Sequence, residues 1–488
     1  MNDVKKAVMT NWRWVMCAML FFATTVNYMD RQVLSLTFKE FIQPEFHWTD
    51  SDYGTITGVF SIAYAIFCLF AGKFIDWMGT KKGYLWAIVV WSLGAVMHAA
   101  CGIATTWFVS GVDSVAALRA VEAGSALAST IAMVSVWLFL ACRMVLGLGE
   151  AGNFPAAIKV TAEYFPKKDR AFATSIFNAG ASVGALAAPA TIPLLAKSMG
   201  WEWAFIIIGA LGFLWAGIWI FVYDKPEESK HVNEAELEYI HQDETADAQS
   251  QKSKVESKEE KQMSFAEAFK HKQTWSFAFG KFMTDGVWWF FLFWAPAYFQ
   301  DQFGIKASDP QGIALIFTLY AIVTVISLFG GYLPKIFVEK KGMEPYAGRM
   351  RAMLIFAFFP ILALFAQPLG GVYGPWAVAI IIGIVGAAHQ SWSANIFSTT
   401  GDMFPKSAVA TITGIGAMAG GVGSFLINKG SGMLFTYGEK MGDAFSFAGF
   451  TGKPAAYMIV FCICAVAYLI GWSVMKALVP KYKPVVVE

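Results

Sequence analysis

The sequence predicts an all-α membrane protein in which twelve transmembrane helices form two pseudo-symmetric six-helix bundles. The first observation is composition: 57 % of the 488 residues are hydrophobic and only 15 % are charged, whereas soluble domains carry roughly 25 % charged residues. The second is that apolar runs long enough to cross a bilayer recur along the whole chain. The third is an internal repeat that divides these runs into two sets of six.

The predicted spans lie on either side of a polar segment. Residues 224–272 are rich in Glu, Lys, Gln and Ser, which is typical of a solvated linker. We therefore expect an N-terminal bundle over residues 1–223, a cytoplasmic linker over 224–272 and a C-terminal bundle over 273–488. The spans are expected near residues 13–36, 54–75, 83–104, 130–158, 170–196, 203–223, 273–299, 312–334, 350–367, 374–398, 407–430 and 455–478.

Two short helices can form within or beside this linker. Residues 233–242 have the composition of a short helix. Residues 264–270 can approach the seventh span as an amphipathic turn, with Ser264 as N-cap and Glu267 three residues later.

The distribution of basic residues predicts the orientation in the membrane. Most of the 37 Lys and Arg residues lie on the side of the two termini and the linker, so this side is predicted to be cytoplasmic. The protein is expected to be multi-pass in the cell inner membrane. Two outer loops, near residues 105–129 and 431–454, are long and rich in Gly, Ala and Ser, and we expect partly ordered caps there. The loops on the side of the membrane away from the termini hold only seven Lys and Arg residues, which are Lys39, Arg119, Lys197, Lys306, Lys429, Lys440 and Lys453.

Two segments of the first half recur in the second. Residues 163–171, EYFPKKDRA, align with residues 402–410, DMFPKSAVA, and each precedes a Gly-rich run that predicts close helix packing. By the same offset Glu150 aligns with His389. Residues 72–83, GKFIDWMGTKKG, align with 331–342, GYLPKIFVEKKG. Such symmetry is typical of transporters with a substrate site at the midplane between the halves.

Charged side chains occur inside the first and fourth spans. Arg143 and Glu150 are seven residues apart, which puts them on one helix face about 10 Å apart along the axis. Asp30 and Arg31 are adjacent and point about 100° apart. An ionised group in hydrocarbon costs at least about 2.5–3.5 kcal/mol, so these residues face other helices or a wet cavity. They either hold helices together or serve in transport.

Residues 72–83 resemble the signature loop of the major facilitator superfamily. The matching residues are Gly72, Asp76, Gly79, Lys81 and Lys82. The resemblance implies a gating role for Asp76, in which it braces the outward-facing state by pairing with basic residues and a helix N-terminus. The alternative is that the loop only carries cytoplasmic positive charge.

The motifs Tyr28-x-Asp30-Arg31 and Arg143-x6-Glu150 look like the anion:cation symporter branch of that superfamily. Residues 281–289 and 388–395 are similar to those of hexuronate transporters, which carry glucuronate and galacturonate. The resemblance implies that Arg31 binds the substrate carboxylate and that Asp30 and Glu150 carry protons. It further implies that Arg143 tunes the two carboxylates.

Further polar and aromatic side chains complete the predicted substrate site. Trp289 or Trp392 is expected to stack on the sugar, and Lys281 and Asp285 have the spacing of an ion pair that serves a gate or the cavity. For each of these residues, helix packing or interhelical hydrogen bonding is the alternative interpretation. The predicted substrate contacts besides Arg31 are Tyr28, Tyr64, Asn178, His389, Gln390, Trp392 and Asn395.

These observations predict a proton-coupled importer of hexuronate anions that works by alternating access. The expected partners are a small sugar-acid anion, protons and the lipid bilayer, with a monomeric chain and no nucleic acid. No catalytic residue, cofactor or metal is expected, since the six Cys and six His show no ligand spacing. The alternatives are another sugar acid or organic anion, such as an aldonate or sialic acid, or an uncoupled exchanger. The linker is too small and polar to fold as a sensor domain.

Overall fold

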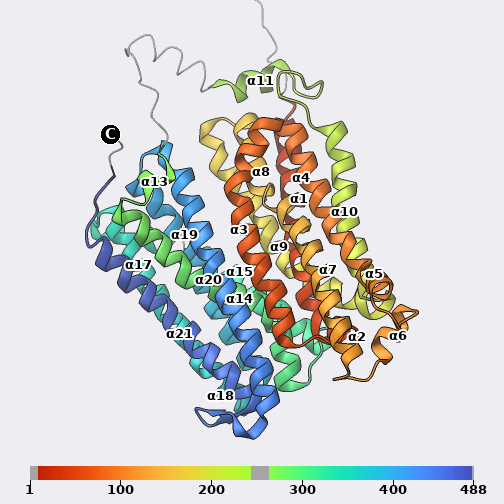
Figure 1. Ribbon diagram of the computed structural model, residues 1–488. Helices are drawn as coiled ribbons and strands as arrows, with labels where there is room; N and C mark the ends of the chain where they lie inside the picture. Colours follow the sequence, from red (N-terminus) through yellow and green to blue (C-terminus); the bar gives the residue numbers. More distant parts are fainter. Residues whose placement is uncertain (1–8, 243–262, 331, 486–488) are drawn as a thin grey trace, which may run out of the picture.

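A computed structural model describes residues 9–242, 263–330 and 332–485, and this part of the chain is almost entirely helical (Figure 1). The prediction of an all-α fold is confirmed. The exception within the described residues is a small antiparallel hairpin, in which β1 (Ser446–Phe447) pairs with β2 (Phe450–Thr451). The hairpin lies in the loop near residues 431–454, where a partly ordered cap was predicted.

The first half is a series of long helices joined by short turns. It comprises α1 (Trp12–Thr37), the π-helix η1 (Phe38–Ile42), α2 (Gln43–Phe46), α3 (Asp50–Met78), α4 (Thr80–Ala99), α5 (Cys101–Phe108), α6 (Val115–Ala120), α7 (Ala126–Glu150), α8 (Asn153–Tyr164), α9 (Lys167–Met199) and α10 (Trp201–Val222). The predicted cap near residues 105–129 contains the end of α5 and all of α6. The helix α5 packs on α6 and α7, and α6 packs on α2.

The second half begins after the polar segment and has the same character. It comprises α14 (Lys272–Phe303), α15 (Pro310–Gly330), α16 (Tyr332–Lys341), α17 (Pro345–Phe358), the 3₁₀-helix η2 (Phe359–Phe365), α18 (Ala366–Tyr373), α19 (Pro375–Met403), α20 (Lys406–Met441), the 3₁₀-helix η3 (Gly442–Ala444) and α21 (Gly452–Leu478).

Two short helices also form where the sequence allowed them. The helix α11 (Glu234–Ile240) is capped by the side chain of Asn233, and α13 (Phe265–Ala268) is capped by Ser264, whose hydroxyl accepts the amide hydrogen of Glu267 at 3.2 Å. The capping prediction for Ser264 is therefore confirmed.

Nine helices or joined helix pairs in the described residues are long and apolar enough to cross a membrane, and the bent pair α4–α5 makes a tenth. The predicted first and seventh spans correspond to α1 and α14, which are 26 and 32 residues long and carry the charged residues noted above. Together these segments follow the order of the twelve predicted spans.

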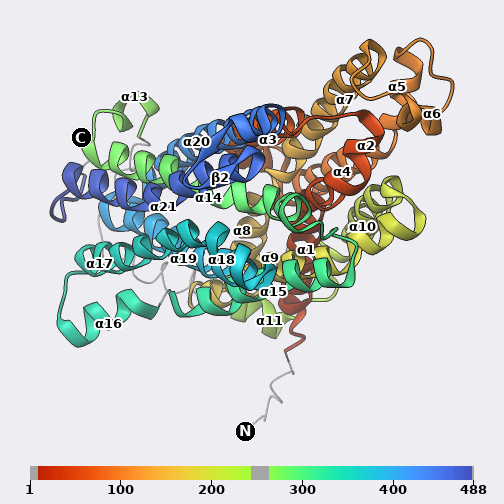
Figure 2. The same cartoon turned by 90° about the horizontal axis from the view of Figure 1, so that it is seen from below.

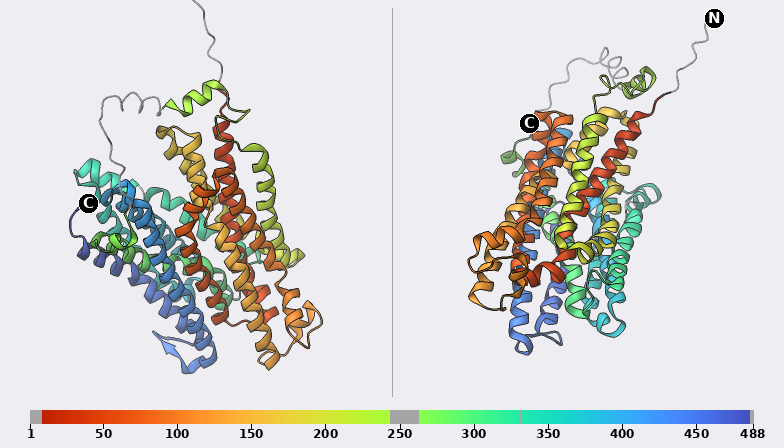
Figure 3. Two further views of the ribbon diagram at one scale, coloured as in Figure 1. Left: turned by 45° about the horizontal axis from the view of Figure 1, so that its top comes forward. Right: turned by 90° about the vertical axis from the view of Figure 1, so that its right-hand side faces the viewer.

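The helices are arranged in two groups that follow the sequence (Figure 2). In the first half α1 packs on α9, and α4 on α7 and α10; in the second, α14 packs on α20 and α21, and α15 on α19. The halves meet where α3 packs on α20, α9 on α15 and α1 on α14. The start of α1 and the end of α21 lie at the same end of the bundle (Figure 3). We call the opposite end, where α2, α6 and α18 lie, the far end (Figure 1).

The Gly-rich runs of α9 and α20 are packing surfaces, as predicted. A Cβ added at Gly180 of α9 would lie 2.4 Å from the carbonyl oxygen of Phe21 in α1. A Cβ at Gly423 of α20 would lie 2.1 Å from the carbonyl oxygen of Phe282 in α14. Both separations are too short for any side chain, so only glycine allows these backbones to approach.

A pair of alanine substitutions tests this packing. We expect Gly180→Ala to lower the free energy of unfolding by about 1–3 kcal/mol, the usual cost of overpacking. The matched control is Gly217→Ala in α10, where nothing lies within 4 Å of an added Cβ and where the change should be neutral or stabilising. Thermal unfolding of both purified variants in detergent measures the difference. Equal melting temperatures would contradict the close approach of α1 and α9.

Candidate functional site

The centre of the predicted site is an ion pair between α1 and α7. The Nε and Nη2 atoms of Arg31 both donate to Oε2 of Glu150, at 3.1 and 2.8 Å. Arg31 is 6 % exposed and Glu150 is 1 % exposed. The sequence placed Glu150 on a common face with Arg143, but the ion pair that forms joins two different helices.

Aromatic rings surround the guanidinium of Arg31. Its Cζ atom lies 4.6 Å from the ring centre of Tyr64, 5.4 Å from that of Tyr28 and 5.3 Å from that of Trp289. Rings at these distances attract a cation and hold it in place. Because Trp289 belongs to α14, both halves of the chain contribute to this site. We call Arg31, Glu150 and these three rings the arginine site.

Beside the arginine site lie two charged groups whose hydrogen-bonding capacity is unfilled. Asp30 is 1 % exposed, and neither of its carboxyl oxygens accepts a hydrogen bond from any described residue. Arg143 is 3 % exposed; its Nη1 has no partner there, and its Cζ lies 5.4 Å from the ring centre of Phe60. Both Arg143 and Glu150 are near enough to Asp30 to interact with it electrostatically. Unfilled buried polar atoms are costly, which makes them candidates for a functional role.

A second polar group lies in the other half, around His389 of α19. Its Nδ1 atom is hydrogen-bonded to the hydroxyl of Tyr468 at 2.6 Å, and its ring stacks on Trp288 with 5.5 Å between centres. Tyr468 also donates to the carbonyl of Thr284 at 3.3 Å. The sequence analysis missed Tyr468, because this residue stands in an apolar run with no motif around it.

The helix α14 connects the two groups. Trp288 contacts His389 and Trp289 contacts Arg31, although they are consecutive residues. Neighbouring residues on a helix point about 100° apart. One turn of α14 therefore touches both polar groups, as expected for a site between two halves.

The three other predicted residues of α19 differ in their contacts. Trp392 is fully buried against the edge of Tyr468, with ring centres 5.5 Å apart, and its Nε1 has no partner among the described residues. Asn395 is 3 % exposed and donates from Nδ2 to the carbonyl of Ser391 at 2.8 Å. Gln390 is half-buried, and its side chain makes no hydrogen bond within the described residues.

Lys281 and Asp285 form the ion pair that their spacing predicted. The Nζ atom of Lys281 lies 2.8 Å from Oδ2 of Asp285 and 4.2 Å from the ring centre of Phe397. An added Cβ at Gly420 of α20 would lie 2.3 Å from Oδ2 of Asp285, so a glycine makes room for this carboxylate. The pair is mostly buried, and its gating role remains a prediction.

Two predicted residues lie apart from these groups. Asp76 is paired with Lys159 at 2.8 Å, and its side chain is 74 % exposed. The partner belongs to α8, so Asp76 joins two helices of the first half. Asn178 on α9 is exposed, and its side chain makes no hydrogen bond within the described residues.

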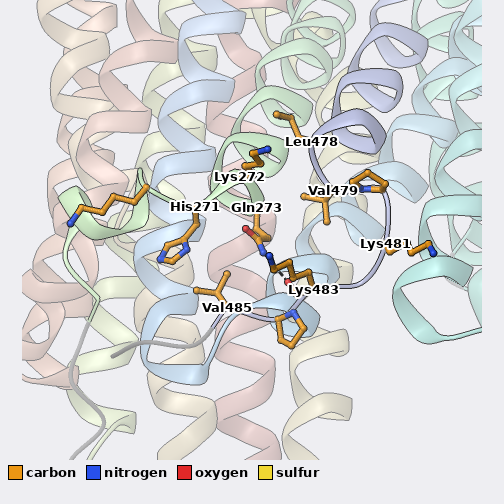
Figure 4. Close-up of a pocket in the computed structure, with 11 residues that line it drawn as sticks. His271, Lys272, Gln273, Leu478, Val479, Lys481, Lys483 and Val485 are labelled. Atoms are coloured by element: carbon orange, nitrogen blue, oxygen red, sulfur yellow. Dashed lines mark hydrogen bonds between the residues drawn. The ribbon is translucent and has the colours of Figure 1, made fainter.

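A surface hollow of about 400 Å³ lies beside the segment that follows α21 (Figure 4). It is bordered by the start of α14 and the segment after α21, with Gln273 donating from Nε2 to the carbonyl of Lys483 at 2.9 Å. Its lining includes Lys270, Lys272 and Lys481. None of the predicted site residues lines this hollow, so it is separate from the arginine site.

Long membrane-spanning helices, with charged groups buried between two halves, define a multi-pass membrane transporter. The chain belongs to the Major Facilitator Superfamily, whose sequence profile matches residues 20–427. The resemblance noted in residues 72–83 is thereby confirmed. Members of this superfamily are transporters, and the chain is not an enzyme.

Three curated relatives are similar over much of the chain. The hexuronate transporter of Escherichia coli (strain K12) is 28 % identical over 414 residues, 85 % of each chain. The galacturonate transporter of Dickeya chrysanthemi is 27 % identical over 73 % of this chain and 92 % of its own. The D-galactonate transporter of Escherichia coli O6:H1 is 26 % identical over 67 % of this chain and 68 % of its own.

Two solved structures confirm the fold. A bacterial homologue of the human lysosomal transporter Spinster aligns with a TM-score of 0.65 and 18 % identity, over 96 % of this chain and 98 % of that one. The D-xylose-proton symporter aligns with a TM-score of 0.64 and 15 % identity, over 97 % and 98 %. The architecture is therefore shared over the whole length.

A double-mutant cycle tests the ion pair at the centre of the site. Removing one partner leaves the other as a buried, unpaired charge, at a cost of about 3–5 kcal/mol. We expect Arg31→Met and Glu150→Leu each to lower the melting temperature, and the double variant to lose much less than their sum. Additive losses would contradict the pair.

The control for this cycle is the pair Lys81–Asp224. Its atoms are also 2.8 Å apart, but its side chains are 37 % and 46 % exposed. Exposed pairs contribute about 0–1 kcal/mol, so the same cycle there should give a coupling close to zero.

Proposed function

We propose that the chain imports a hexuronate anion, galacturonate or glucuronate, together with protons, by alternating access across the cell inner membrane. The observation that carries this proposal is the buried guanidinium of Arg31, which two hydrogen bonds tie to one oxygen of Glu150. A sugar acid as substrate is supported by two of the similar proteins, which are named as a hexuronate transporter and a D-galactonate transporter. The excess of basic residues on the side of the two termini supports a cytoplasmic location for the N-terminus and the C-terminus.

Arg31 is suited to bind the substrate carboxylate. A guanidinium presents parallel N–H groups that match the two oxygens of a carboxylate, and such charge-assisted pairs are strong. Tyr28, Tyr64 and Trp289 surround it and offer faces on which a sugar ring can stack. In the described structure Glu150 occupies the donors that the substrate needs.

Competition for Arg31 provides a physical basis for coupling. A proton on Glu150 cancels its charge and weakens its hold on Arg31, which frees the guanidinium for the substrate. When the substrate leaves, Glu150 pairs again and loses its proton. The site then always holds one negative charge opposite Arg31, because the substrate replaces the ionised Glu150. One proton per monoanion makes this cycle electroneutral.

Asp30 is the second proton site in this proposal. Its two oxygens lack donors among the described residues, and an ionised carboxylate without donors is costly in a buried position. Arg143, the neighbouring charge, sets how readily Asp30 and Glu150 ionise. A proton on Asp30 that moves with each cycle would make uptake electrogenic, and a membrane potential would then drive it.

The second half supplies the contacts to the sugar hydroxyls. His389 uses Nδ1 to bind Tyr468, which leaves Nε2 for a ligand. Asn395 donates from Nδ2 to its own helix and keeps Oδ1 for a hydroxyl. Gln390 has a side chain without a hydrogen bond among the described residues. From the first half, the exposed Asn178 of α9 offers a further side-chain amide. Trp392 completes the wall of the site from behind Tyr468.

Two ion pairs of this proposal act as gates. Lys281–Asp285 lies within α14, so that its charges stay neutralised while the helix moves. Asp76–Lys159 joins α3 to α8 near the end of the bundle that holds the termini. The protein works as a monomer and needs neither metal nor cofactor.

An aldonate is the second candidate substrate. The D-galactonate transporter matches the chain at 26 % identity, nearly the value for the hexuronate transporter, and an aldonate presents the same carboxylate to Arg31. Uptake into liposomes that hold the purified protein separates the candidates. Labelled galacturonate should accumulate only under an inward proton gradient, and unlabelled glucuronate should block it more strongly than galactonate. The reverse order would assign the aldonate.

Glu150→Gln tests the coupling. A glutamine cannot ionise, so the variant should lose proton-driven accumulation of galacturonate at least tenfold. Counterflow, in which internal galacturonate exchanges for labelled external galacturonate, should survive because it needs no net proton movement. The control is Glu267→Gln, a change of the same kind outside the bundle core, which should accumulate normally. Gradient-driven accumulation in Glu150→Gln would rule out its proton role.

A further inference from the structure

Four charged side chains form a closed ring at the far end of the bundle. Lys39 of η1 lies 2.6 Å from Oδ1 of Asp50, at the start of α3, and 3.1 Å from Oδ1 of Asp301 in α14. Lys453 of α21 lies 2.5 Å from Oδ2 of Asp50 and 2.9 Å from Oδ2 of Asp301. Each lysine therefore touches both aspartates, and positive and negative charges alternate around the ring.

The ring is buried, which makes its pairing obligatory. The side chains of Lys39 and Asp50 are 7 % and 0 % exposed, and those of Asp301 and Lys453 are 11 % and 12 % exposed. A buried charge that loses its partner costs several kcal/mol. Any movement that opens the ring must therefore leave every charge with a partner.

Each half of the chain contributes one lysine and one aspartate. Lys39 and Asp50 come from the first half, and Asp301 and Lys453 from the second. If the halves separate, the contacts Lys39–Asp301 and Lys453–Asp50 break, while Lys39–Asp50 and Lys453–Asp301 remain. The ring can thus divide into two neutral pairs without leaving a charge unpaired, and the exposed Glu439, whose Oε2 lies 3.5 Å from Nζ of Lys453, stays with the second half.

The ring lies among the other polar contacts between the halves. Ser308 donates to Glu40 at 2.7 Å, and the amide of Ser51 donates to the hydroxyl of Thr436 at 2.9 Å. The hydroxyl of Tyr53 donates to the carbonyl of Phe293 at 2.8 Å. Among the described residues, every hydrogen bond and ion pair that joins the first half to the second lies toward this end. They are Ser51–Thr436, Tyr53–Phe293, Lys39–Gln300, Glu40–Ser308, Ser51–Lys429, Thr55–Lys429, Lys39–Asp301 and Asp50–Lys453.

Helix packing closes the same end. A Cβ added at Gly54 of α3 would lie 2.6 Å from the carbonyl oxygen of Asn428 in α20. A Cβ at Gly432 of α20 would lie 2.3 Å from the carbonyl oxygen of Asp50. The two helices therefore meet backbone to backbone directly beside the ring, and the described structure is closed at the far end.

We propose that the ring formed by Lys39, Asp50, Asp301 and Lys453 is the gate that closes the far end and opens by dividing into two neutral pairs. The proposal rests on the alternating access proposed above, in which the far end faces the outside of the cell. The proposal assigns a function to four charged residues that the predicted spans place in loops. It depends on no property of the sugar acid or of the proton sites.

Inverting the charges of one half tests the gate. In the variant Lys39→Asp/Asp50→Lys the pair within the first half survives, but both contacts to the second half become repulsive. We expect the open state of the far end to become the major population. Distances between spin labels at Ser110→Cys and Lys440→Cys, two exposed positions at that end, report this in a chain whose native cysteines are replaced. The distribution should shift to longer distances than in the parent.

A second pair of spin labels distinguishes opening by alternating access from local disruption of the ring. Labels at Lys82→Cys and Lys340→Cys lie at the other end of the bundle, on α4 and α16. Opening of the far end by alternating access should shorten this distance, whereas a locally disrupted ring should leave it unchanged. These distances are measured without substrate or gradient, so a failed transport assay and a failed gate remain distinguishable.

Two further variants make the test complete. The converse inversion, Asp301→Lys/Lys453→Asp, creates the same repulsions from the other half and should give the same shift if the first variant does not fold. Combining both inversions restores an alternating ring with reversed signs and should return the parent distances. The control Lys335→Glu/Glu339→Lys inverts an exposed pair within one half and should change neither distance. Unchanged distances in both inverted variants, or no recovery in the fourfold variant, would overturn the proposal.

Discussion

The ion pair between Arg31 and Glu150 is the interaction on which the arrangement of the site depends. It joins α1 to α7 inside a bundle where an unpaired charge costs several kcal/mol. The helices around it are brought close by glycine: a Cβ at Gly149 would lie 2.3 Å from the backbone nitrogen of Trp91. The pair is therefore held by tight packing but uses only one oxygen of Glu150, which leaves it open to competition.

The centre of the bundle and its far end are connected through α1. Arg31 lies near the end of this helix, and Lys39 follows eight residues later in the π-helix η1. A π-helical turn is an irregular element that often marks a functional site. In the proposed mechanism the substrate replaces Glu150 as the partner of Arg31, so α1 loses its ion pair to α7. The same stretch of chain carries Lys39, one of the two lysines of the ring. In the proposed mechanism, substrate binding at Arg31 and opening of the ring therefore act on the same segment of the chain.

The sequence predicted the fold and the residues of the arginine site, but not their partners. The length of the chain, its hydropathy and the internal repeat were sufficient to predict the order of the transmembrane spans. The motifs around Asp30 and Glu150 identified charged residues that lie in one cluster. Periodicity along one helix associated Glu150 with Arg143, whereas the ion pair crosses to Arg31. Tyr468 and the ring of Lys39, Asp50, Asp301 and Lys453 could not be predicted, because their contacts join segments far apart in the chain and no local pattern records them.

The central claim is that substrate carboxylate and Glu150 compete for Arg31. Isothermal titration of the purified protein with galacturonate, in buffers of different ionisation enthalpy, counts the protons taken up on binding. The account predicts uptake of about one proton per galacturonate where Glu150 is ionised, since a neutral Glu150 releases Arg31. Tight binding without proton uptake by the unmodified protein would contradict the account, because substrate and ionised Glu150 would then occupy the site together.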